Sequence, residues 1–131
     1  MPGRKSPTFT EVELEFMQII WASGEVSTED VQTTLRKRGR ELSDGSIRKI
    51  LSILMTKGHL SRRRSGKSFY YRAKVHKEQA AGTMIQDLLK RAFNGSVPSM
   101  VATLLKSRDM STDDFDAIKR LIAEHEKEEN S

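Results

Sequence analysis

A change of period within residues 46–72, SIRKILSILMTKGHLSRRRSGKSFYYR, constrains the fold more than any other feature of the chain. Its first part carries apolar residues at helical spacing, which form one narrow stripe made of Ile47, Ile50, Leu51 and Leu54. The pattern stops at Lys57-Gly58, where glycine suits a helix end. Three arginines, a turn signal and an aromatic run follow, so a short helix leads directly into a basic hairpin.

The hairpin is predicted from a Ser65-Gly66-Lys67 turn between two segments that can alternate as strands. Phe69 and Tyr71 then share one face, and we expect them to anchor the hairpin to the helices. An arginine triplet taken alone is usually a solvated surface, and an aromatic run usually packs rather than stacks on bases. The order of helix, turn and basic hairpin is therefore more specific than its parts.

Cap signals mark two helices before this stretch. Thr10 and Glu13 have capping-box spacing, and that helix should end at Ser23-Gly24. Ser27 should cap a second helix that ends near Gly39. The intervening GEVS is predicted to be an isolated strand or a turn. Ser43 is expected to cap the helix of the apolar stripe.

Three further helices are predicted after Lys77, ending with one that Ser111 caps. The last residues, EHEKEENS, are expected to fray into solvent. We therefore expect a loose arm over 1–8, a winged-helix domain over 9–76 and a helical dimerisation segment over 77–131.

Composition narrows the function classes. The chain has 131 residues and no cysteine, which excludes disulfides, thiolate catalysis and cysteine-based metal sites. The absence of an apolar stretch of membrane-spanning length, or of a signal-peptide core, favours the cytoplasm and no membrane association. Residues 1–78 hold 16 basic and 9 acidic residues, a balance of +7, whereas residues 79–131 are net −2. The basic part favours a polyanionic partner.

The fold class follows: mainly α with a small β-hairpin wing, a winged helix-turn-helix plus a C-terminal helical segment. A helix suits the DNA major groove if it buries one face and offers small, polar and basic side chains on the other. The wing would reach the phosphates. The predicted DNA-binding residues are Ser43, Ser46, Arg48, Lys49, Ser52, Arg64 and Lys67.

Other function classes fit less well. His59, His76 and His125 lie in three different segments, and no phosphate loop or nucleophile motif is present, so we expect no enzyme, cofactor or metal. A winged helix used only for protein–protein contact is the main alternative. RNA binding is a weaker one, because the chain lacks a typical single-strand recognition motif.

The chain resembles the penicillinase-repressor family of bacterial winged-helix regulators, the BlaI/MecI/CopY type. The matching stretches are TEVELEFMQIIW, SIRKILSILMTKGHL and GKSFYYRAKV, continuing through FNGSVPSMVATLL and MSTDDFDAIKRLI. The resemblance implies a dimeric repressor of palindromic operators, with β-lactamase-type resistance or stress genes as targets. Ser46 stands where the family usually has threonine, and Ile53 where it often has a basic residue, so the operator sequence is expected to differ.

The C-terminal segment is predicted to hold the dimer together. Three short helices cannot easily bury all of its apolar residues, namely Met84, Leu88, Leu89, Val101, Leu104, Leu105, Ile118, Leu121 and Ile122. In the resembling repressors a sensor protease triggers a cut within this segment. The resemblance places that cut at the Thr103-Leu104 bond here.

Overall fold

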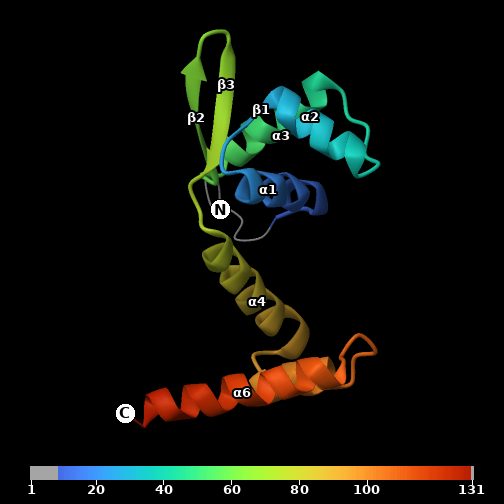
Figure 1. The fold of residues 1–131 in the computed structure, drawn as a ribbon, viewed down its shortest axis with the longest axis vertical. Coiled ribbons are helices and arrows are strands. Elements are labelled where there is room, and N and C mark those ends of the chain that lie inside the picture. Colours follow the sequence, from blue (N-terminus) through green and yellow to red (C-terminus); the bar gives the residue numbers. More distant parts are fainter. Residues whose placement is uncertain (1–8, 131) are drawn as a thin grey trace. The chain divides into compact units, whose positions relative to one another are not determined.

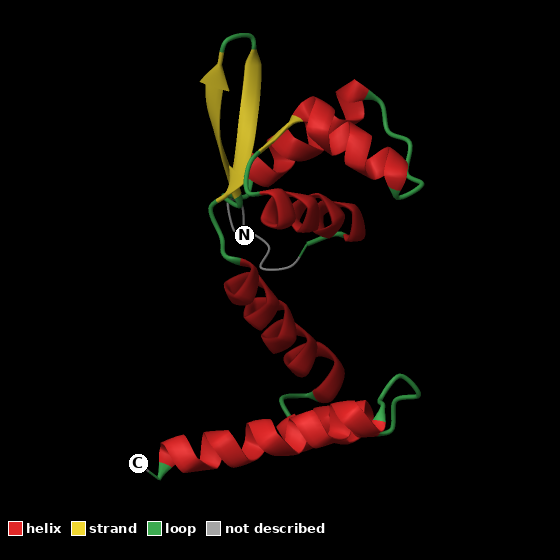
Figure 2. Cartoon of the chain, in the orientation of Figure 1, coloured by secondary structure: helices red, strands yellow, loops and turns green. Residues whose placement is uncertain are grey.

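The computed structural model describes residues 9–130, and the expected N-terminal arm over 1–8 lies outside them (Figure 1). The elements are α1 (Glu11–Ser23), β1 (Val26–Ser27), α2 (Thr28–Lys37), α3 (Asp44–Thr56), β2 (Leu60–Ser65), β3 (Ser68–Ala73), α4 (Lys77–Phe93), α5 (Val97–Leu105) and α6 (Thr112–Glu129). Helices dominate, and the strands form one small antiparallel sheet (Figure 2). The predicted fold class is confirmed.

The predicted caps fix where the helices start. The hydroxyl of Thr10 accepts the backbone N–H of Glu13 at 3.1 Å, and the Glu13 carboxylate accepts the N–H of Thr10 at 3.0 Å. Ser27 and Ser111 form the same reciprocal capping box at α2 and α6. Each box satisfies two of the backbone donors that a helix start leaves unpaired. Gly24 ends α1 with a φ of 86°, a left-handed value that favours glycine.

One hydrophobic core holds α1, α2, α3 and the sheet together. Its buried members are Phe16, Met17, Ile19, Ile20, Val26, Val31, Leu35, Ile47, Leu51, Leu54, Leu60 and Tyr71. Phe69 packs against this cluster while partly exposed, so the predicted anchoring of the hairpin by Phe69 and Tyr71 is confirmed. The indole N–H of Trp21 adds a bond of 2.9 Å to the carbonyl of Val75, which fixes the chain after the sheet to α1.

The sheet has the order β1-β3-β2. Val26 and Ser27 pair with Tyr71 and Tyr70, so GEVS does contain a strand, but that strand belongs to the sheet and is not isolated as predicted. A two-residue strand gives no periodicity, and only its pairing with the distant Tyr70 and Tyr71 places it in the sheet. We call β2, β3 and the turn between them the wing, which extends past the three helices beside it (Figure 1).

Contacts divide the chain into two compact units, residues 1–87 and 88–131, and the division falls within α4. In the second unit α5 begins at the N-cap Ser96, and α6 continues to Glu129. The expected fraying of EHEKEENS is therefore wrong up to Glu129, and Ser131 lies outside the described residues. Glutamate and lysine are good helix formers, and His125 lies one turn from Glu129 with 3.6 Å between Nε2 and Oε1.

Within residues 9–130, every helix is too short or too polar to cross a lipid bilayer.

Candidate nucleic-acid interface

Helix α3 has one buried and one open face. Ile47, Leu51 and Leu54 have no exposed surface and belong to the core. The opposite face is exposed and presents Lys49 and Ser52. A short helix with this division can lie against the domain and still offer polar and basic groups to a groove.

The hydroxyl of Ser43 is engaged in starting α3. Its Oγ accepts the backbone N–H of Ser46 at 3.1 Å and donates to the Ser46 hydroxyl at 3.0 Å. Both serines are exposed and lie at the N-terminal end of α3, whose first helical residue is Asp44. Arg48 follows one turn later, and its Nε donates to the Asp44 carboxylate at 2.7 Å. Of the predicted residues at this end of α3, Ser43 and Ser46 are therefore bonded to each other, and Arg48 is paired with Asp44.

The wing is closed by a two-residue turn. Gly66 has a φ of 62°, a left-handed value that glycine adopts at little cost. Arg64 Nε donates to the carbonyl of Gly66 at 3.2 Å, which holds the arginine against its own turn. Lys67 is the second turn residue and is exposed. The predicted pair of cations, Arg64 and Lys67, therefore lies at the tip of the wing.

The three consecutive arginines have three different environments, because successive side chains of a strand point to opposite faces. Arg62 lies over the ring of Phe69, with Cζ 4.0 Å from its centroid, and Arg64 lies 5.9 Å from the same ring. Arg63 lies on the other face, over Tyr70 at 5.0 Å. The alternation of side chains along a strand is enough to predict that Arg63 points away from Arg62 and Arg64. The stacking of Arg62 on Phe69 cannot be predicted in this way, because it depends on the register of β2 and β3.

Arg63 is held by a bidentate ion pair with Glu25, the residue before β1. The two bonds measure 3.0 Å from Nε to Oε2 and 2.7 Å from Nη2 to Oε1. Hydrogen bonding from Arg63 lowers the pKa of the Glu25 carboxyl, and the same bond raises the pKa of Arg63. The charge of Arg63 is thus already paired with a carboxylate of the same chain.

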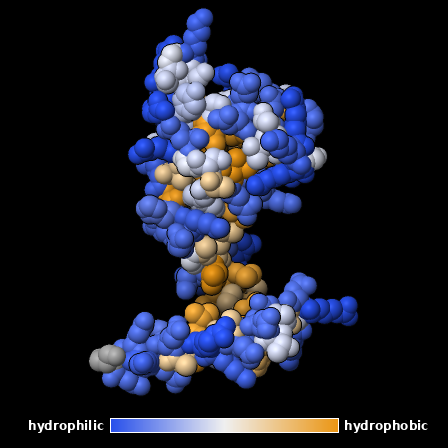
Figure 3. Space-filling model, in the orientation of Figure 1, coloured by the Kyte–Doolittle hydropathy of each residue, from blue (hydrophilic) through white to orange (hydrophobic). Residues whose placement is uncertain are grey.

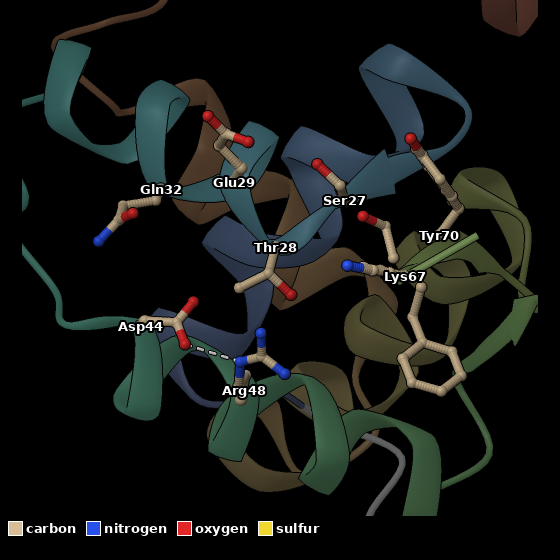
Figure 4. Close-up of a pocket in the computed structure, with 10 residues that line it drawn as sticks. Ser27, Thr28, Glu29, Gln32, Asp44, Arg48, Lys67 and Tyr70 are labelled. Atoms are coloured by element: carbon tan, nitrogen blue, oxygen red, sulfur yellow. Dashed lines mark hydrogen bonds and ion pairs between the residues drawn. The ribbon is translucent and has the colours of Figure 1, made fainter. Parts of the chain in front are cut away.

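Two grooves run between α3 and the wing. The larger, of about 460 Å³, is lined by the start of α2, by Asp44 and Arg48 of α3, and by residues 67–70 of the wing (Figure 4). We call it the front groove. The smaller, of about 350 Å³, is lined by Arg48 and Ser52 of α3 and by Arg62 and Phe69 of the wing, among others. We call it the side groove.

The grooves bring together part of the predicted set. Arg48 lines both, with Lys67 in the front groove and Ser52 in the side groove. Lys49 lines neither and lies on the exposed surface of α3. Arg62, which was not predicted, joins Arg48 and Ser52 in the side groove. Arg48, Ser52, Arg62 and Lys67 therefore lie along the grooves between α3 and the wing.

The predicted dimerisation residues are largely exposed in the single chain. Leu88, Val101, Leu104, Leu105, Leu121 and Ile122 are between 40% and 63% exposed, Met84 and Ile118 are half-buried, and Leu89 is buried. Figure 3 shows apolar side chains at the surface of the C-terminal helices. Ile85, Val97 and Phe115 are further exposed apolar residues of these helices. Thr103 is exposed too, and its hydroxyl donates to the Ser99 carbonyl at 3.0 Å within α5.

No cluster of three or more potential metal ligands occurs in the part of the chain that the structure describes.

Comparisons with known proteins agree with the fold just described. A penicillinase repressor of Bacillus licheniformis is 27% identical over 122 residues, which cover 93% of this chain and 94% of that protein. The methicillin resistance regulatory protein MecI of Staphylococcus aureus is 22% identical over 118 residues, covering 90% and 95%. The solved DNA-binding domain of the repressor BlaI matches with a TM-score of 0.50 and 28% identity over 58% of this chain and 93% of that domain. The family model "Penicillinase repressor" matches residues 9–124, and the chain belongs to this family.

Proposed function

We propose that this protein represses transcription by binding operator DNA with α3 in the major groove and the wing on the adjacent phosphates. Its membership of a family of transcriptional repressors, rather than enzymes, makes it a repressor. The observation that carries the DNA-binding mode is the single face on which exposed groups of α3 lie beside the cations of the wing. Because operator DNA lies in the cytoplasm of bacteria, we propose the cytoplasm as the compartment of this protein.

The two elements have different tasks in this proposal. Ser46, Lys49 and Ser52 lie on the exposed side of α3, where side chains can reach base edges and carry sequence preference. Arg64 and Lys67 lie at the wing tip, where contacts with phosphates set affinity and register without reading bases. The structural likeness to the DNA-binding domain of BlaI supports this use of the fold.

Substitutions in the two elements should therefore separate specificity from affinity. Lys49→Ala or Ser46→Ala should change which base pairs are selected from a random duplex pool, since one good base contact carries about 1–3 kcal/mol of discrimination. Arg64→Ala or Lys67→Ala should weaken binding to all sequences and lower the salt slope by about one unit. Lys106→Ala, an exposed cation of the second unit, is the matched control. An unchanged base-pair preference in the Lys49 and Ser46 variants would contradict the proposal that α3 lies in the major groove.

A winged helix used only for protein contact is the alternative, and salt dependence distinguishes the two. Phosphate contacts release counterions, so binding to duplex DNA should fall steeply between 50 and 200 mM salt, roughly 10³-fold or more for several contacts. Binding that is absent, or that does not respond to salt, would favour the alternative.

We further propose a homodimer formed by residues 77–131, acting at palindromic operators. The support is the exposed apolar surface of these helices in the single chain. A two-fold partner would cover that surface and set two copies of α3 about 34 Å apart, one DNA turn. Leu121→Asp should convert the dimer to a monomer in sedimentation, whereas Ile53→Asp, at an exposed apolar position of α3, should not. A dimer that survives Leu121→Asp and truncation after Val75 would place the interface elsewhere.

We also propose that the repressor is released from DNA when a protease cuts its Thr103-Leu104 bond. Both residues are exposed on α5, which would have to unwind for a protease to act. Loss of the residues beyond the cut would separate the two half-site contacts, whose coupling strengthens binding by about 10²–10⁴-fold. Induced cells should then accumulate a fragment ending at Thr103. Full-length protein in cells whose target genes are active would rule out the cut and point to a bound effector or partner.

The names of the relatives refer to penicillinase and methicillin resistance. We propose resistance or related stress genes as the targets of this repressor, with a sensor protease as its upstream partner.

A further inference from the structure

The ion pair between Asp44 and Arg48 is an unusual feature for a surface meant to meet polyanionic DNA. Asp44 is the first residue of α3, and its Oδ2 accepts from Arg48 Nε at 2.7 Å. Both side chains are largely exposed, at 59% and 63%. Both also line the front groove, so the carboxylate lies on the face that we assign to DNA. A negative charge at this place opposes binding unless it serves another purpose.

The ion pair between Asp44 and Arg48 is not explained by a contribution to the stability of the fold. An exposed pair one helical turn apart contributes little, because water screens the charges and two side chains lose freedom. Ser43 already caps α3 through its hydroxyl, so the helix start does not depend on Asp44 alone.

The pair does fix the direction of the guanidinium group. Asp44 occupies Nε, which leaves the two terminal nitrogens at the end of the planar group as donors. Figure 4 shows these nitrogens pointing away from Asp44, towards the part of the front groove that Thr28 and Lys67 line. Two parallel donors at the end of an arginine match O6 and N7 of guanine in the major groove. Fixing them before binding lowers the entropy lost on contact.

The carboxylate also discriminates by repulsion. Base edges that present acceptors, such as O4 of thymine, would face the Asp44 oxygens unfavourably, whereas the amino group of cytosine could donate to them. A repulsive group that penalises the wrong partner raises specificity at some cost in affinity. As the groove closes on DNA and water leaves, both effects grow, because the lower dielectric strengthens the charge interactions.

From this geometry we infer that Asp44 is a specificity-determining residue, which positions Arg48 to read one guanine and penalises acceptor edges beside it. The inference rests on the proposed function, since it assigns roles within the same DNA-binding face. Asp44 acts on guanine through Arg48, so it is a positioning residue for that contact.

The test compares wild type with Asp44→Ala, Asp44→Asn and Arg48→Ala in selections from a random duplex pool, with affinities measured on the selected and an unrelated duplex. Glu29→Gln is the matched control, because it removes one negative charge from the same groove. Wild type should select guanine at one position, and Arg48→Ala should lose that preference. Asp44→Ala should reduce it by about 10-fold while binding the unrelated duplex more tightly. Glu29→Gln should keep it.

The outcomes separate the two hypotheses. Wild type without any sequence preference would refute the proposed function itself. If wild type has a preference for guanine that Arg48→Ala or Asp44→Ala leaves intact, only the present inference is refuted. The same holds if Glu29→Gln loses the preference as much as Asp44→Ala does, because Asp44 would then act only through its negative charge in the groove. Asp44→Asn keeps the shape of the side chain and should shift the preference in the same direction. It therefore replaces Asp44→Ala if circular dichroism shows that the alanine variant has lost helix.

Discussion

The contact between Glu13 and Lys57 joins the start of α1 to the end of α3 and gives the sharpest test of how the helices are held. Both carboxylate oxygens of Glu13 accept from Lys57 Nζ at 2.9 Å, and one also accepts the N–H of Thr10 at 3.0 Å. The two side chains are only 8% and 25% exposed. Burial raises the pKa of the Glu13 carboxyl, but the bonds from Lys57 and Thr10 outweigh it and hold that pKa below its ordinary value.

Lys57→Met keeps most of the apolar stem and removes the ammonium group. It leaves the Glu13 carboxylate buried with a single backbone donor. Loss of charge-assisted hydrogen bonds to a buried group costs about 2 kcal/mol of the free energy of unfolding. For a unit of this size, that loss corresponds to a fall of roughly 8–16 °C in melting temperature.

The pH dependence has a defined sign. A carboxyl whose pKa is lowered by folding adds stability that is complete above its unfolded pKa of about 4.3 and disappears as the pH falls through its folded pKa. Protonation of Glu13 in acid therefore removes the same contact that Lys57→Met removes. The difference in unfolding free energy between wild type and variant should shrink as the pH falls from 7 towards 3.

Urea unfolding followed by the fluorescence of Trp21 reports on this unit alone, because the chain has one tryptophan and its indole is bonded to Val75. Arg36→Met is the matched control, since it breaks an exposed ion pair with Glu41. It should cost about 0–1 kcal/mol. An equal cost for the two variants, or a cost for Lys57→Met that is the same at pH 7 and pH 3, would refute the reasoning.

Two further predictions concern the core and the wing. Leu51→Ala should lower the free energy of unfolding by about 3 kcal/mol in the same urea assay, because Leu51 has no exposed surface, whereas Ile53→Ala on the exposed side of α3 should change it little. Arg63→Gln should leave the salt slope of DNA binding unchanged, because Glu25 already neutralises this arginine, whereas Arg64→Gln should lower the slope by about one unit. A slope that falls equally in both variants, measured by fluorescence anisotropy on one duplex, would contradict the structure of the wing.

Local rules were enough to predict most of the elements. The reciprocal bonds of Thr10 with Glu13 are short-range, and so is the apolar stripe of α3, so each can be recognised within a few residues of sequence. The tail of α6 was missed because its exposed charges give no apolar stripe, although their helix propensity is high. The pairing of β1 with β3 was missed because it is a contact between distant parts of the chain.

The candidate site was predictable as a set of residue types but not as a set of contacts. The exposed face of α3 follows from helical periodicity, so Lys49 and Ser52 could be assigned to it. Nothing local indicates that Glu25 meets Arg63 across 38 positions, or that Arg62 stacks on Phe69 and faces α3. Asp44 was assigned no role because one carboxylate at a helix start is ordinary, and only its bond to Arg48 within a groove gives it one.

Ion pairing within the winged-helix unit limits which cations are available to attract DNA to the proposed face. Five acidic side chains of this unit are engaged by basic ones, in the pairs Arg36–Glu41, Arg40–Glu15, Arg48–Asp44, Lys57–Glu13 and Arg63–Glu25. In the described part of the unit, Lys49, Arg64 and Lys67 have no such carboxylate partner and lie on α3 and the wing tip. Net charge alone would spread the attraction over the whole surface. Arg48 and Arg63 are paired although they lie on α3 and the wing, so Lys49, Arg64 and Lys67 are the groups there that we expect to supply long-range attraction to DNA.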